Sequence, residues 1–297
     1  MGSALEEIGS AVRSVHTAVA ESVVGVGREG SGVVVGKDLV ATNAHNLRGE
    51  VTTVTFADGR QMAAEVAGVD VDGDVAVLRV DTAGAPGLAW AEAEAGLGDV
   101  IFGVANPGGR GVRVTLGTVS AVGQPFRGPR GRRVAASLEH TAPLPRGASG
   151  GPVVDAAGRI LGLNTHRPQE GFYLALPASA ELIARLEALG RGESRSRPRL
   201  GIALAPPRAT RQLREAAGLP DVTGLLVRGV EEDGPAAAAG LRRGDVLVTA
   251  GGRSLTSVDD LHEALDAASG SLDLGIVRGV EEFQVSVALA SGAGQTP

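Results

Sequence analysis

The chain contains no cysteine among its 297 residues. Disulfides, a thiol nucleophile and thiolate metal ligands are therefore excluded, and the stability of the fold must come from packing. Aromatic residues make up only 2% of the sequence, which leaves few side chains for stacking on nucleobases or sugar rings. No apolar run approaches the roughly 18–20 residues that a membrane-spanning helix needs, so we expect no membrane segment.

An excess of positive charge is also absent, because 28 cationic residues face 34 anionic ones and the net charge is −6. This balance argues against a binder of nucleic acid or of anionic membranes. The first residues contain no basic stretch followed by an apolar one, and Glu6 and Glu7 stand where a signal peptide would be basic or apolar. As written, the chain is expected in the cytoplasm, and a periplasmic or extracytoplasmic place stays open if the N-terminus was trimmed.

Two candidate motifs for binding a cofactor or a metal match in spacing but lack a required feature. Gly25–Gly30 has the spacing of a dinucleotide fingerprint, but an apolar strand-like run follows where that fingerprint requires a helix. Asp70, Asp72 and Asp74 have the spacing of a calcium loop, but Val75 occupies the position that requires glycine. The five histidines show no His-x₃-His pairing. We therefore predict neither a metal site nor a cofactor.

The length predicts two domains, and the 45 glycines, together with many valines, predict a chain rich in strands and tight turns. Residues 1–20 are predicted to form an N-terminal helix, because apolar residues recur there at three- and four-residue steps. This apolar stripe packs either on the body of the protein or on a neighbouring subunit. Its members are Leu5, Ile8, Val12, Val15 and Val19.

Residues 21–189 contain about a dozen short apolar runs broken by turn residues such as Asp58-Gly59, and this pattern predicts antiparallel barrels or a sandwich. A helix is predicted at its end, over Glu181–Leu189. Residues 190–199 read GRGESRSRPR and predict an exposed linker. Residues 200–290 mix strands with two helices, Ala209–Ala217 and Val258–Ala268, as in a small α+β domain, and 291–297 form a tail.

A serine stands inside a glycine-rich turn, Gly147-Ala148-Ser149-Gly150-Gly151-Pro152, ahead of an apolar run. Such a turn lets the amide N–H groups of Gly147 and Ser149 converge beside the hydroxyl, which is the arrangement that stabilises the oxyanion of acyl transfer. Glycine–serine turns are common, so the motif alone also fits an ordinary loop.

Two partners favour the catalytic interpretation. His45 follows the apolar run Leu39–Ala41, and Asp74 stands just ahead of Val75–Leu78. A serine hydroxyl needs a base, and the base needs a buried anion that fixes its tautomer and stabilises the imidazolium. The order His45, Asp74, Ser149 is that of the barrel-type serine proteases.

Eight segments, in order, carry a resemblance to a known family. They read GSGVVV at Gly30–Val35, ATNAH at Ala41–His45, GDVAVLRVD at Gly73–Asp81, GASGGPVVD at Gly147–Asp155, GRILGLNT at Gly158–Thr165, FYLALP at Phe172–Pro177, RLGI at Arg199–Ile202 and GPAAAAGLRRGDVLVTAGG at Gly234–Gly252. The chain resembles the HtrA (Deg) family of trypsin-like serine proteases with a C-terminal PDZ domain, over roughly residues 20–290.

The resemblance implies an all-β double β-barrel catalytic domain of the chymotrypsin/trypsin type, followed by a small α+β PDZ domain. It also implies that His45 is the general base, Asp74 its orienting carboxylate and Ser149 the nucleophile. The family further implies an ATP-independent endopeptidase that acts on unfolded or misfolded polypeptides and assembles as a homotrimer; the absence of a P-loop motif agrees with ATP independence.

The chain departs from the family at two places near the serine. Ala148 stands where the family often has asparagine, and the segment beginning at Thr141 lacks the aspartate that the family usually carries near its start. The first change is expected to matter little, because the oxyanion hole is built from backbone. The second concerns the geometry of the loop more than the chemistry.

The residues expected around the side-chain pocket carry no charge. Pro143 lies six positions before the nucleophile, where trypsin-like enzymes place the floor of the S1 pocket, and Leu161, Leu163 and Leu174 come from the expected wall strands. Without a carboxylate to pair with a basic residue, we predict cleavage after small or medium aliphatic residues such as Val, Ala or Ile.

In the second domain, Leu200, Gly201 and Ile202 open a strand whose amides are expected to receive the C-terminal carboxylate of a peptide by strand addition. Leu261 and Leu265 of the second helix would form the opposite wall, although core packing explains either leucine equally well. The alternative to a protease is a proteolytically idle, PDZ-containing scaffold or chaperone, because a triad can be present in a sequence without being assembled.

Overall fold

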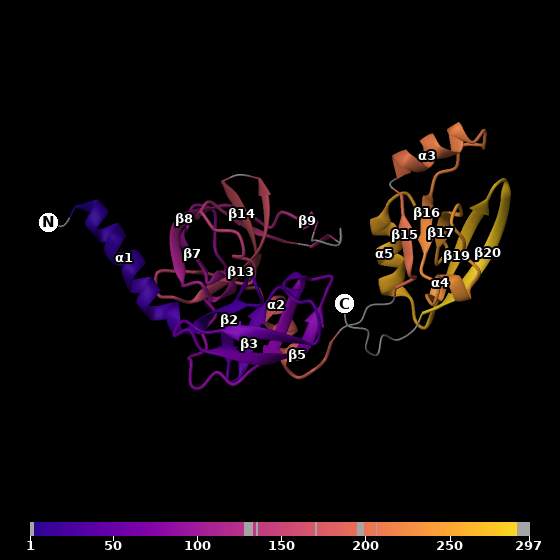
Figure 1. Ribbon diagram of the computed structural model, residues 1–297. Coiled ribbons are helices and arrows are strands. Elements are labelled where there is room, and N and C mark those ends of the chain that lie inside the picture. The colour runs from indigo at the N-terminus through magenta and orange to yellow at the C-terminus, as the bar shows by residue number, and fades with distance from the viewer. Residues whose placement is uncertain are drawn as a thin grey trace. The chain divides into compact units, whose positions relative to one another are not determined.

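The computed structural model describes residues 3–127, 133–134, 136–169, 171–194, 199–205 and 207–289. The chain divides into two compact units, residues 1–195 and 196–295. The first unit contains two closed barrels of six strands each, and the second an open sheet with three helices among its described residues (Figure 1). The predicted tail, 291–297, lies outside the described residues.

The first barrel contains β1 (Val23–Val26), β2 (Gly30–Gly36), β3 (Leu39–Thr42), β4 (Val51–Thr55), β5 (Gln61–Asp70) and β6 (Val75–Arg79) in the order β1-β2-β3-β6-β5-β4. Alternating valines point into its core, among them Val24, Val34 and Val40. Gly59 has the positive φ of 86° that the predicted turn between β4 and β5 requires. In this barrel β3 and β6 are neighbours, with Thr42 opposite Ala76.

The second barrel contains β7 (Val100–Ala105), β8 (Arg113–Val122), β11 (Leu138–His140), β12 (Pro152–Val154), β13 (Ile160–Gln169) and β14 (Phe172–Pro177) in the order β11-β14-β13-β12-β7-β8. Two short strands, β9 (Phe126–Arg127) and β10 (Arg133–Val134), form a separate ladder. Closure of both barrels leaves no unpaired sheet edge within them. The double-barrel fold class is confirmed.

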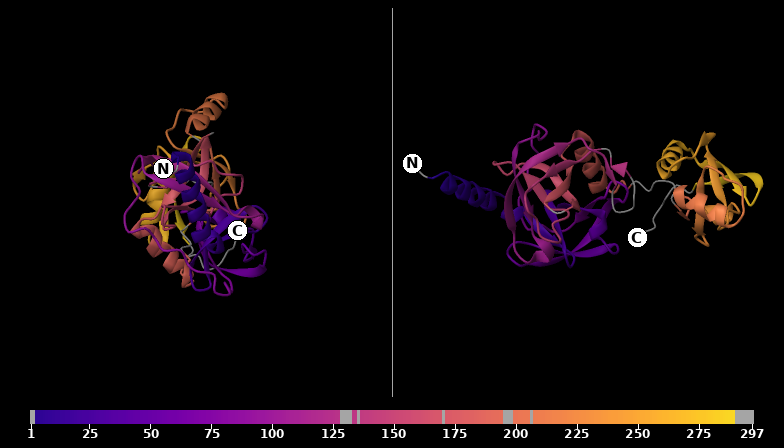
Figure 2. Two further views of the ribbon diagram at one scale, coloured as in Figure 1. Left: turned by 90° about the vertical axis from the view of Figure 1, so that its left-hand side faces the viewer. Right: turned by 90° about the horizontal axis from the view of Figure 1, so that it is seen from above.

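The N-terminal helix α1 (Ala4–Val19) is capped by Ser3, whose hydroxyl accepts from the amide of Glu6. Its apolar stripe serves two environments. Val15 and Val19 are buried against the second barrel, whereas Leu5 is 79% exposed and Ile8 45% exposed. Figures 1 and 2 show the first turns of α1 extending away from the barrels. Packing on the body therefore holds for the C-terminal half of the helix.

The last helix of the first unit, α2 (Ala180–Gly190), packs on β5 and β6. The carbonyl of Gly190 accepts a hydrogen bond from Arg79, and the hydroxyl of Ser194 accepts one from the amide of Val69. Residues 190–194 therefore belong to the first unit, and the predicted linker 190–199 starts too early. The polar sequence of residues 190–194 gave no sign of these contacts, because a backbone carbonyl and a hydroxyl make them rather than apolar side chains.

The second unit contains β15 (Ile202–Leu204), β16 (Leu225–Val230), β17 (Val246–Ala250), β18 (Arg253–Ser254), β19 (Ser271–Arg278) and β20 (Glu281–Ala288), with α3 (Pro207–Ala216), α4 (Pro235–Ala238) and α5 (Val258–Ala267). The sheet order is β15-β16-β17-β19-β20. Ser257 caps α5 together with Asp260. Sequence periodicity missed α4, because it has only four residues.

None of the helices in the described ranges is both long and apolar enough to cross a bilayer.

Candidate active site

His45 and Asp74 stand at the ends of neighbouring strands of the first barrel. His45 lies in a short 3₁₀ turn, Ala44–Asn46, just after β3, and Asp74 ends the turn that precedes β6. Asp74 has a left-handed backbone conformation with φ of 54°, which aspartate tolerates better than most residues. One carboxylate oxygen lies 2.8 Å from Nδ1 of His45, and the other lies 2.9 Å from it.

The carboxylate of Asp74 is buried, with 1% of the residue exposed, and three groups donate to it. They are the imidazole Nδ1–H and the backbone N–H of His45, and the hydroxyl of Thr165 at 2.7 Å. A carboxylate only accepts hydrogen bonds, so Nδ1 of His45 carries a proton. In the neutral ring Nε2 then carries a lone pair, which allows it to act as a base.

Ser149 reaches this pair from the second barrel. Its Oγ donates to the carbonyl oxygen of Thr165 at 2.8 Å, and the hydroxyl of the same threonine donates to Asp74. The structure therefore brings the three predicted residues, His45, Asp74 and Ser149, to one site between the barrels. Over the described parts of the chain, no hydrogen bond joins His45 to Ser149.

The turn before Ser149 presents free amides. Gly147 has φ of 86°, and a Cβ at this position would overlap the carbonyl oxygen of Glu29, so the turn requires glycine. The N–H groups of Gly147 and Ser149 donate to no acceptor within the described ranges. These two amides, on either side of Ala148, are therefore available to another acceptor, and the oxyanion hole at Gly147 and Ser149 stays a prediction.

Residues of the first barrel hold this turn. The hydroxyl of Ser31 donates to the carbonyl of Gly147 at 2.8 Å and accepts from the amide of Asn106 at 3.0 Å. The carbonyl of Ser149 accepts from the backbone N–H of Ser31 at 3.0 Å and from the carboxamide of Asn46 at 2.9 Å. The nucleophile turn is therefore fixed by the barrel that carries His45 and Asp74.

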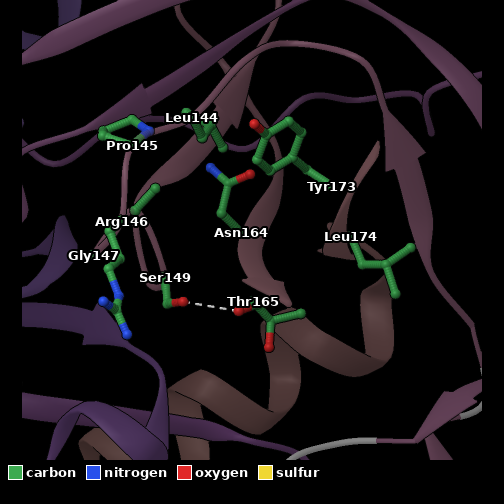
Figure 3. A pocket seen from close by; sticks show the side chains of 10 residues that line it. Leu144, Pro145, Arg146, Gly147, Ser149, Asn164, Thr165, Tyr173 and Leu174 are labelled. Carbon is green, nitrogen blue, oxygen red and sulfur yellow. Dashed lines mark hydrogen bonds between the residues drawn. The ribbon is translucent and has the colours of Figure 1, made fainter. Parts of the chain in front are cut away.

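A pocket of about 390 Å³ opens beside Ser149. Figure 3 shows the side chains around it, with the hydrogen bond from Ser149 to Thr165 drawn as a dashed line. Two leucines supply apolar wall, and an asparagine, a threonine and a tyrosine supply polar groups. The lining residues are Leu144, Pro145, Arg146, Gly147, Ala148, Ser149, Asn164, Thr165, Tyr173 and Leu174.

Of the four residues predicted to form the S1 pocket, Leu174 lines this pocket and the other three do not. Pro143 is exposed, and the next residue, Leu144, lines the pocket instead. Leu161 is buried in the apolar cluster inside the second barrel, and Leu163 is buried in a different cluster, which also contains residues of the first barrel and of α2. Pro143, Leu161 and Leu163, which the sequence placed around the S1 pocket, therefore do not contribute to the pocket beside Ser149.

Sequence reasoning missed the residues that join the site together: Thr165, Ser31 and Asn46, and the pocket residues Asn164 and Tyr173. The available signal was weak. Asn164 and Thr165 follow the apolar run Ile160–Leu163, and polar residues that interrupt a buried strand are generally buried with partners. Within the described residues, no three histidine, aspartate or glutamate side chains gather as a metal site would require.

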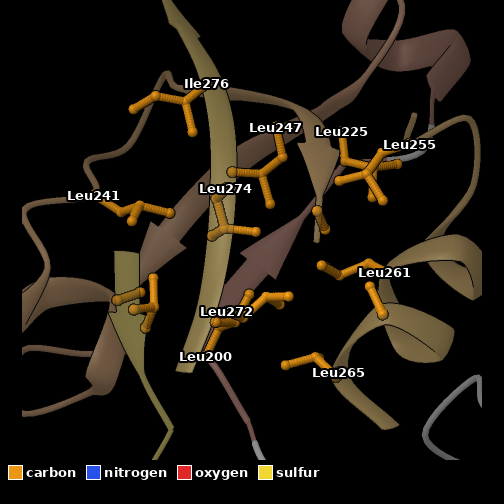
Figure 4. Packing of buried hydrophobic residues seen from close by; sticks show 14 of the residues in the cluster. Leu200, Leu225, Leu241, Leu247, Leu255, Leu261, Leu265, Leu272, Leu274 and Ile276 are labelled. Atoms are coloured by element: carbon orange, nitrogen blue, oxygen red, sulfur yellow. The ribbon is translucent and has the colours of Figure 1, made fainter. Parts of the chain in front are cut away.

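In the second unit the five predicted peptide-binding residues lie together. Leu200, Leu261 and Leu265 are buried in one apolar cluster, where Figure 4 shows their side chains, and Ile202 packs against it. For the leucines of α5 the core interpretation therefore holds in this structure. Gly201, with φ of 72°, turns the chain into β15, which ends the sheet and pairs with β16 alone among the described strands.

The strand register shows which backbone groups of β15 point away from β16. Ile202 lies opposite Val230, and the flanking amide of Glu231 donates to the carbonyl of Gly201. In an antiparallel ladder this pattern makes Ile202 and Val230 a non-hydrogen-bonded pair, so the N–H and C=O of Ile202 point away from β16. One side of β15 thus presents unpaired backbone groups.

Comparisons with known proteins agree with this geometry. Residues 30–163 match the family described as trypsin-like peptidase domain, and residues 226–278 match the PDZ domain. A relative from Halomonas elongata, "Probable periplasmic serine endoprotease DegP-like", is 31% identical over 267 residues, which is 87% of this chain and 55% of the relative. The chain therefore combines a trypsin-like peptidase domain with a C-terminal PDZ domain, and it is similar to serine endoproteases of the HtrA type.

A second curated relative matches over a similar range. "Putative serine protease HhoB" from Synechocystis is 30% identical over 275 residues, covering 87% of this chain and 65% of that protein. This chain thus spans about half to two thirds of the length of these two curated relatives.

Two solved structures share the fold along almost the whole chain. The serine endoprotease from Yersinia pestis gives a TM-score of 0.63 at 26% identity and covers 95% of this chain and 98% of its own. The structure titled "HtrA-type protease AlgW with decapeptide" gives a TM-score of 0.65 at 23% identity, with coverage of 96% and 99%. The double barrel followed by a PDZ domain is therefore the fold of this chain.

Proposed function

We propose that this chain is a serine endopeptidase in which Ser149 is the nucleophile, His45 the general base and Asp74 the residue that orients it. The observation that carries the proposal is the buried carboxylate of Asp74, 2.8 Å from Nδ1 of His45 and joined through Thr165 to the hydroxyl of Ser149. A base fixed in its reactive tautomer stands beside an alcohol and two free amides, which are the parts that acyl transfer needs.

The proposed reaction has two steps. Oγ of Ser149 attacks the scissile carbonyl carbon while its proton passes to Nε2 of His45, and the amides of Gly147 and Ser149 donate to the oxyanion. The imidazolium is stabilised by Asp74, and its Nε2 proton goes to the departing amine. Water then attacks the acyl-enzyme by the same path, giving the carboxylic acid and restoring the Ser149 hydroxyl.

Before the first step Ser149 must leave the carbonyl of Thr165. Rotation about its Cα–Cβ bond moves Oγ between staggered positions, and the proposed reaction requires a rotation that exchanges the acceptor from Thr165 to Nε2 of His45. The exchange replaces one hydrogen bond by another, so its cost is small compared with a catalytic barrier.

The pocket beside Ser149 supports a preference for aliphatic residues at P1. Leu144 and Leu174 give it an apolar wall, and its lining residues include no carboxylate to pair with lysine or arginine. We therefore keep Val, Ala and Ile as the proposed P1 residues, now with Leu144 rather than Pro143 at the wall.

The remaining properties follow from the family. The proposed substrates are unfolded or misfolded polypeptides, cleaved without ATP, and the proposed assembly is a homotrimer. For the PDZ domain, the unpaired edge of β15 at Ile202 supports binding of an extended C-terminal peptide by strand addition, with the carboxylate received by the amides at Leu200, Gly201 and Ile202.

Digestion of an unfolded protein without ATP tests the proposal. We expect the wild-type chain to cleave it and the products to end mainly in small aliphatic residues, and the Ser149→Ala variant to be inactive while binding peptide normally. Retained cleavage by Ser149→Ala would remove the assignment, and products ending mainly in lysine or arginine would remove the proposed P1 preference.

A second candidate is a peptide-binding scaffold or chaperone whose protease domain is idle at rest. The hydrogen bond from Ser149 to Thr165, in place of one to His45, favours it. Labelling with a fluorophosphonate separates the two candidates, because the reagent reacts only with an activated serine. Labelling that appears only when a hydrophobic C-terminal peptide is added would identify an enzyme that is idle until its PDZ domain is occupied.

A further inference from the structure

His140 is a buried histidine that the proposed mechanism does not use. It ends β11, lies opposite Tyr173 of β14 in the register of the second barrel, and has no exposed surface. Its ring stacks on the ring of Tyr173, with centroids 5.7 Å apart and planes inclined by 19°. Cross-strand pairs of this kind hold two side chains in fixed positions. Tyr173 lines the pocket beside Ser149, so His140 contacts a wall residue without lining the pocket itself.

The same imidazole holds a second pocket residue. Its Nε2 lies 2.9 Å from Oδ1 of Asn164. The carboxamide nitrogen of Asn164 donates to the carbonyls of Gly151 and Pro152 at 2.9 and 3.2 Å. Because both partners are acceptors, this nitrogen cannot be exchanged with Oδ1, and the orientation of the carboxamide is fixed. Asn164 therefore connects His140 to the strand that follows the nucleophile.

This arrangement defines the tautomer of His140. Oδ1 of Asn164 only accepts, so the proton of the neutral ring is on Nε2. Nδ1 is then a bare lone pair, buried and without a hydrogen-bond partner in the part of the chain that the structure describes. Burial lowers the pKa of His140 below the usual 6.5, which keeps the ring neutral near pH 7.

We infer that His140 is a positioning residue for substrate recognition: it holds Asn164 and Tyr173 in the wall of the pocket and so limits which P1 side chains fit. This inference rests on the proposed protease function. A buried histidine with a purely structural role would affect stability alone, whereas one that fixes two pocket residues also affects the selection of substrate. A wall that can repack accepts more shapes than a rigid one.

Two variants separate the contacts of His140. His140→Phe keeps an aromatic ring against Tyr173 but leaves Oδ1 of Asn164 without its donor. His140→Gln keeps an amide donor near the position of Nε2 and loses the ring. Ser137→Ala is the matched control, because Ser137 is buried in the same segment and its hydroxyl donates to the carbonyl of Gln124, which does not line the pocket.

The readout is cleavage of two peptides that differ only at P1, with Val in one and Phe in the other. The ratio measured is kcat/KM for the Val peptide divided by kcat/KM for the Phe peptide. In His140→Phe we expect this ratio to fall about tenfold, mainly through changes in KM. The rate of fluorophosphonate labelling of Ser149 should stay within about threefold of wild type. His140→Gln loses the ring against Tyr173, so its ratio should also fall, by about threefold or more, whereas Ser137→Ala should keep the ratio within about twofold.

An unchanged ratio in His140→Phe, or an equal fall in Ser137→Ala, would overturn the inference while leaving the proposed function intact. If the wild-type chain neither cleaves the peptides nor reacts with the fluorophosphonate, the proposed function fails, and the inference fails with it. The two failures are thus distinguishable.

A measurement on the wild-type chain covers the case in which His140→Phe does not fold. In the ¹⁵N spectrum of the histidine rings at pH 7, the His140 signals, assigned by comparison with His140→Gln, should show a protonated Nε2 and a bare Nδ1. A peptide boronate with Val at P1 should shift them, whereas one with Gly at P1, which leaves the pocket empty, should not. A protonated Nδ1, or equal shifts with both boronates, would contradict the inference.

Discussion

Thr165 makes the two contacts that join the site at the scale of single residues. Its hydroxyl donates to the carboxylate of Asp74, and its carbonyl accepts from Ser149. The three predicted residues come from two barrels, and this threonine of β13 lies between them. Buried polar side chains with two partners of this kind decide the geometry of a site more than its apolar surroundings do.

Replacing Thr165 by valine keeps the shape of the side chain and removes one donor to Asp74. Hydrogen bonds to charged groups are worth about 1.5–3 kcal/mol, so we expect kcat to fall at least about tenfold in Thr165→Val, with KM little changed. Steady-state kinetics on a peptide substrate measures both constants. A kcat within about twofold of wild type would show that this hydroxyl does not help to hold Asp74.

The pKa of His140 predicts a pH dependence of stability. Burial lowers this pKa in the folded state, so the unfolded chain binds the proton more tightly and the free energy of unfolding falls as the pH drops below 6.5. The loss is complete once the pH is below the folded-state pKa. Chemical denaturation at pH 8 and pH 5 should show a larger loss for wild type than for His140→Gln; equal losses would contradict the assigned environment.

At the scale of elements, the turn that carries Ser149 is fixed by contacts with the first barrel. The hydroxyl of Ser31, on β2, holds the carbonyl of Gly147 and receives the amide of Asn106. Such contacts between segments far apart in the sequence leave no periodic signal, so the motif predicted the turn but not what holds it.

Ser31→Ala and Ser22→Ala form a matched pair that tests this element. Both serines have no exposed surface, and the hydroxyl of Ser22 donates to the carbonyl of Pro86, a residue outside the nucleophile turn. We expect each variant to lose about 1–2 kcal/mol of stability, and only Ser31→Ala to lose about tenfold in kcat. Equal kcat values in the two variants would remove Ser31 from the support of the turn.

The apolar stripe of helix α1 contains both buried and exposed residues. Val19 is fully buried and Leu5 is 79% exposed. In the monomeric state, thermal or chemical unfolding should show a loss of about 2 kcal/mol for Val19→Ala and a change within about 0.5 kcal/mol for Leu5→Ala. Similar losses in both variants would mean that the exposed end of the helix is covered in solution.

At the scale of the whole molecule, the fold could be predicted from the sequence more fully than the lining of the pocket. Short valine-rich runs and turn pairs such as Asp58-Gly59 predicted the barrels, because side-chain alternation and positive φ are local properties. The pocket was harder. Pro143 and Leu144 are adjacent, and only Leu144 lines the pocket; the turn that follows them is held by partners more than a hundred residues away, which leave no local signal.

The proposed catalytic site and the proposed peptide-binding edge lie in different units. His45, Asp74, Ser149 and the pocket residues all belong to the first unit, whereas the free edge of β15 belongs to the second. A C-terminal peptide is therefore expected to bind without Ser149. Calorimetry with a hydrophobic C-terminal peptide should give equal affinities for wild type and Ser149→Ala, and amidation of the peptide should weaken binding at least about tenfold. Equal binding of the amidated peptide would contradict capture of the carboxylate.

The most direct test of the account is the rate at which a fluorophosphonate reacts with Ser149, measured with and without the hydrophobic C-terminal peptide. We predict that the wild-type chain is labelled at Ser149 in at least one of the two conditions, that Ser149→Ala is not labelled, and that His45→Ala is labelled more than about a hundredfold more slowly. Labelling of wild type no faster than that of His45→Ala in both conditions would contradict the claim that this serine is activated.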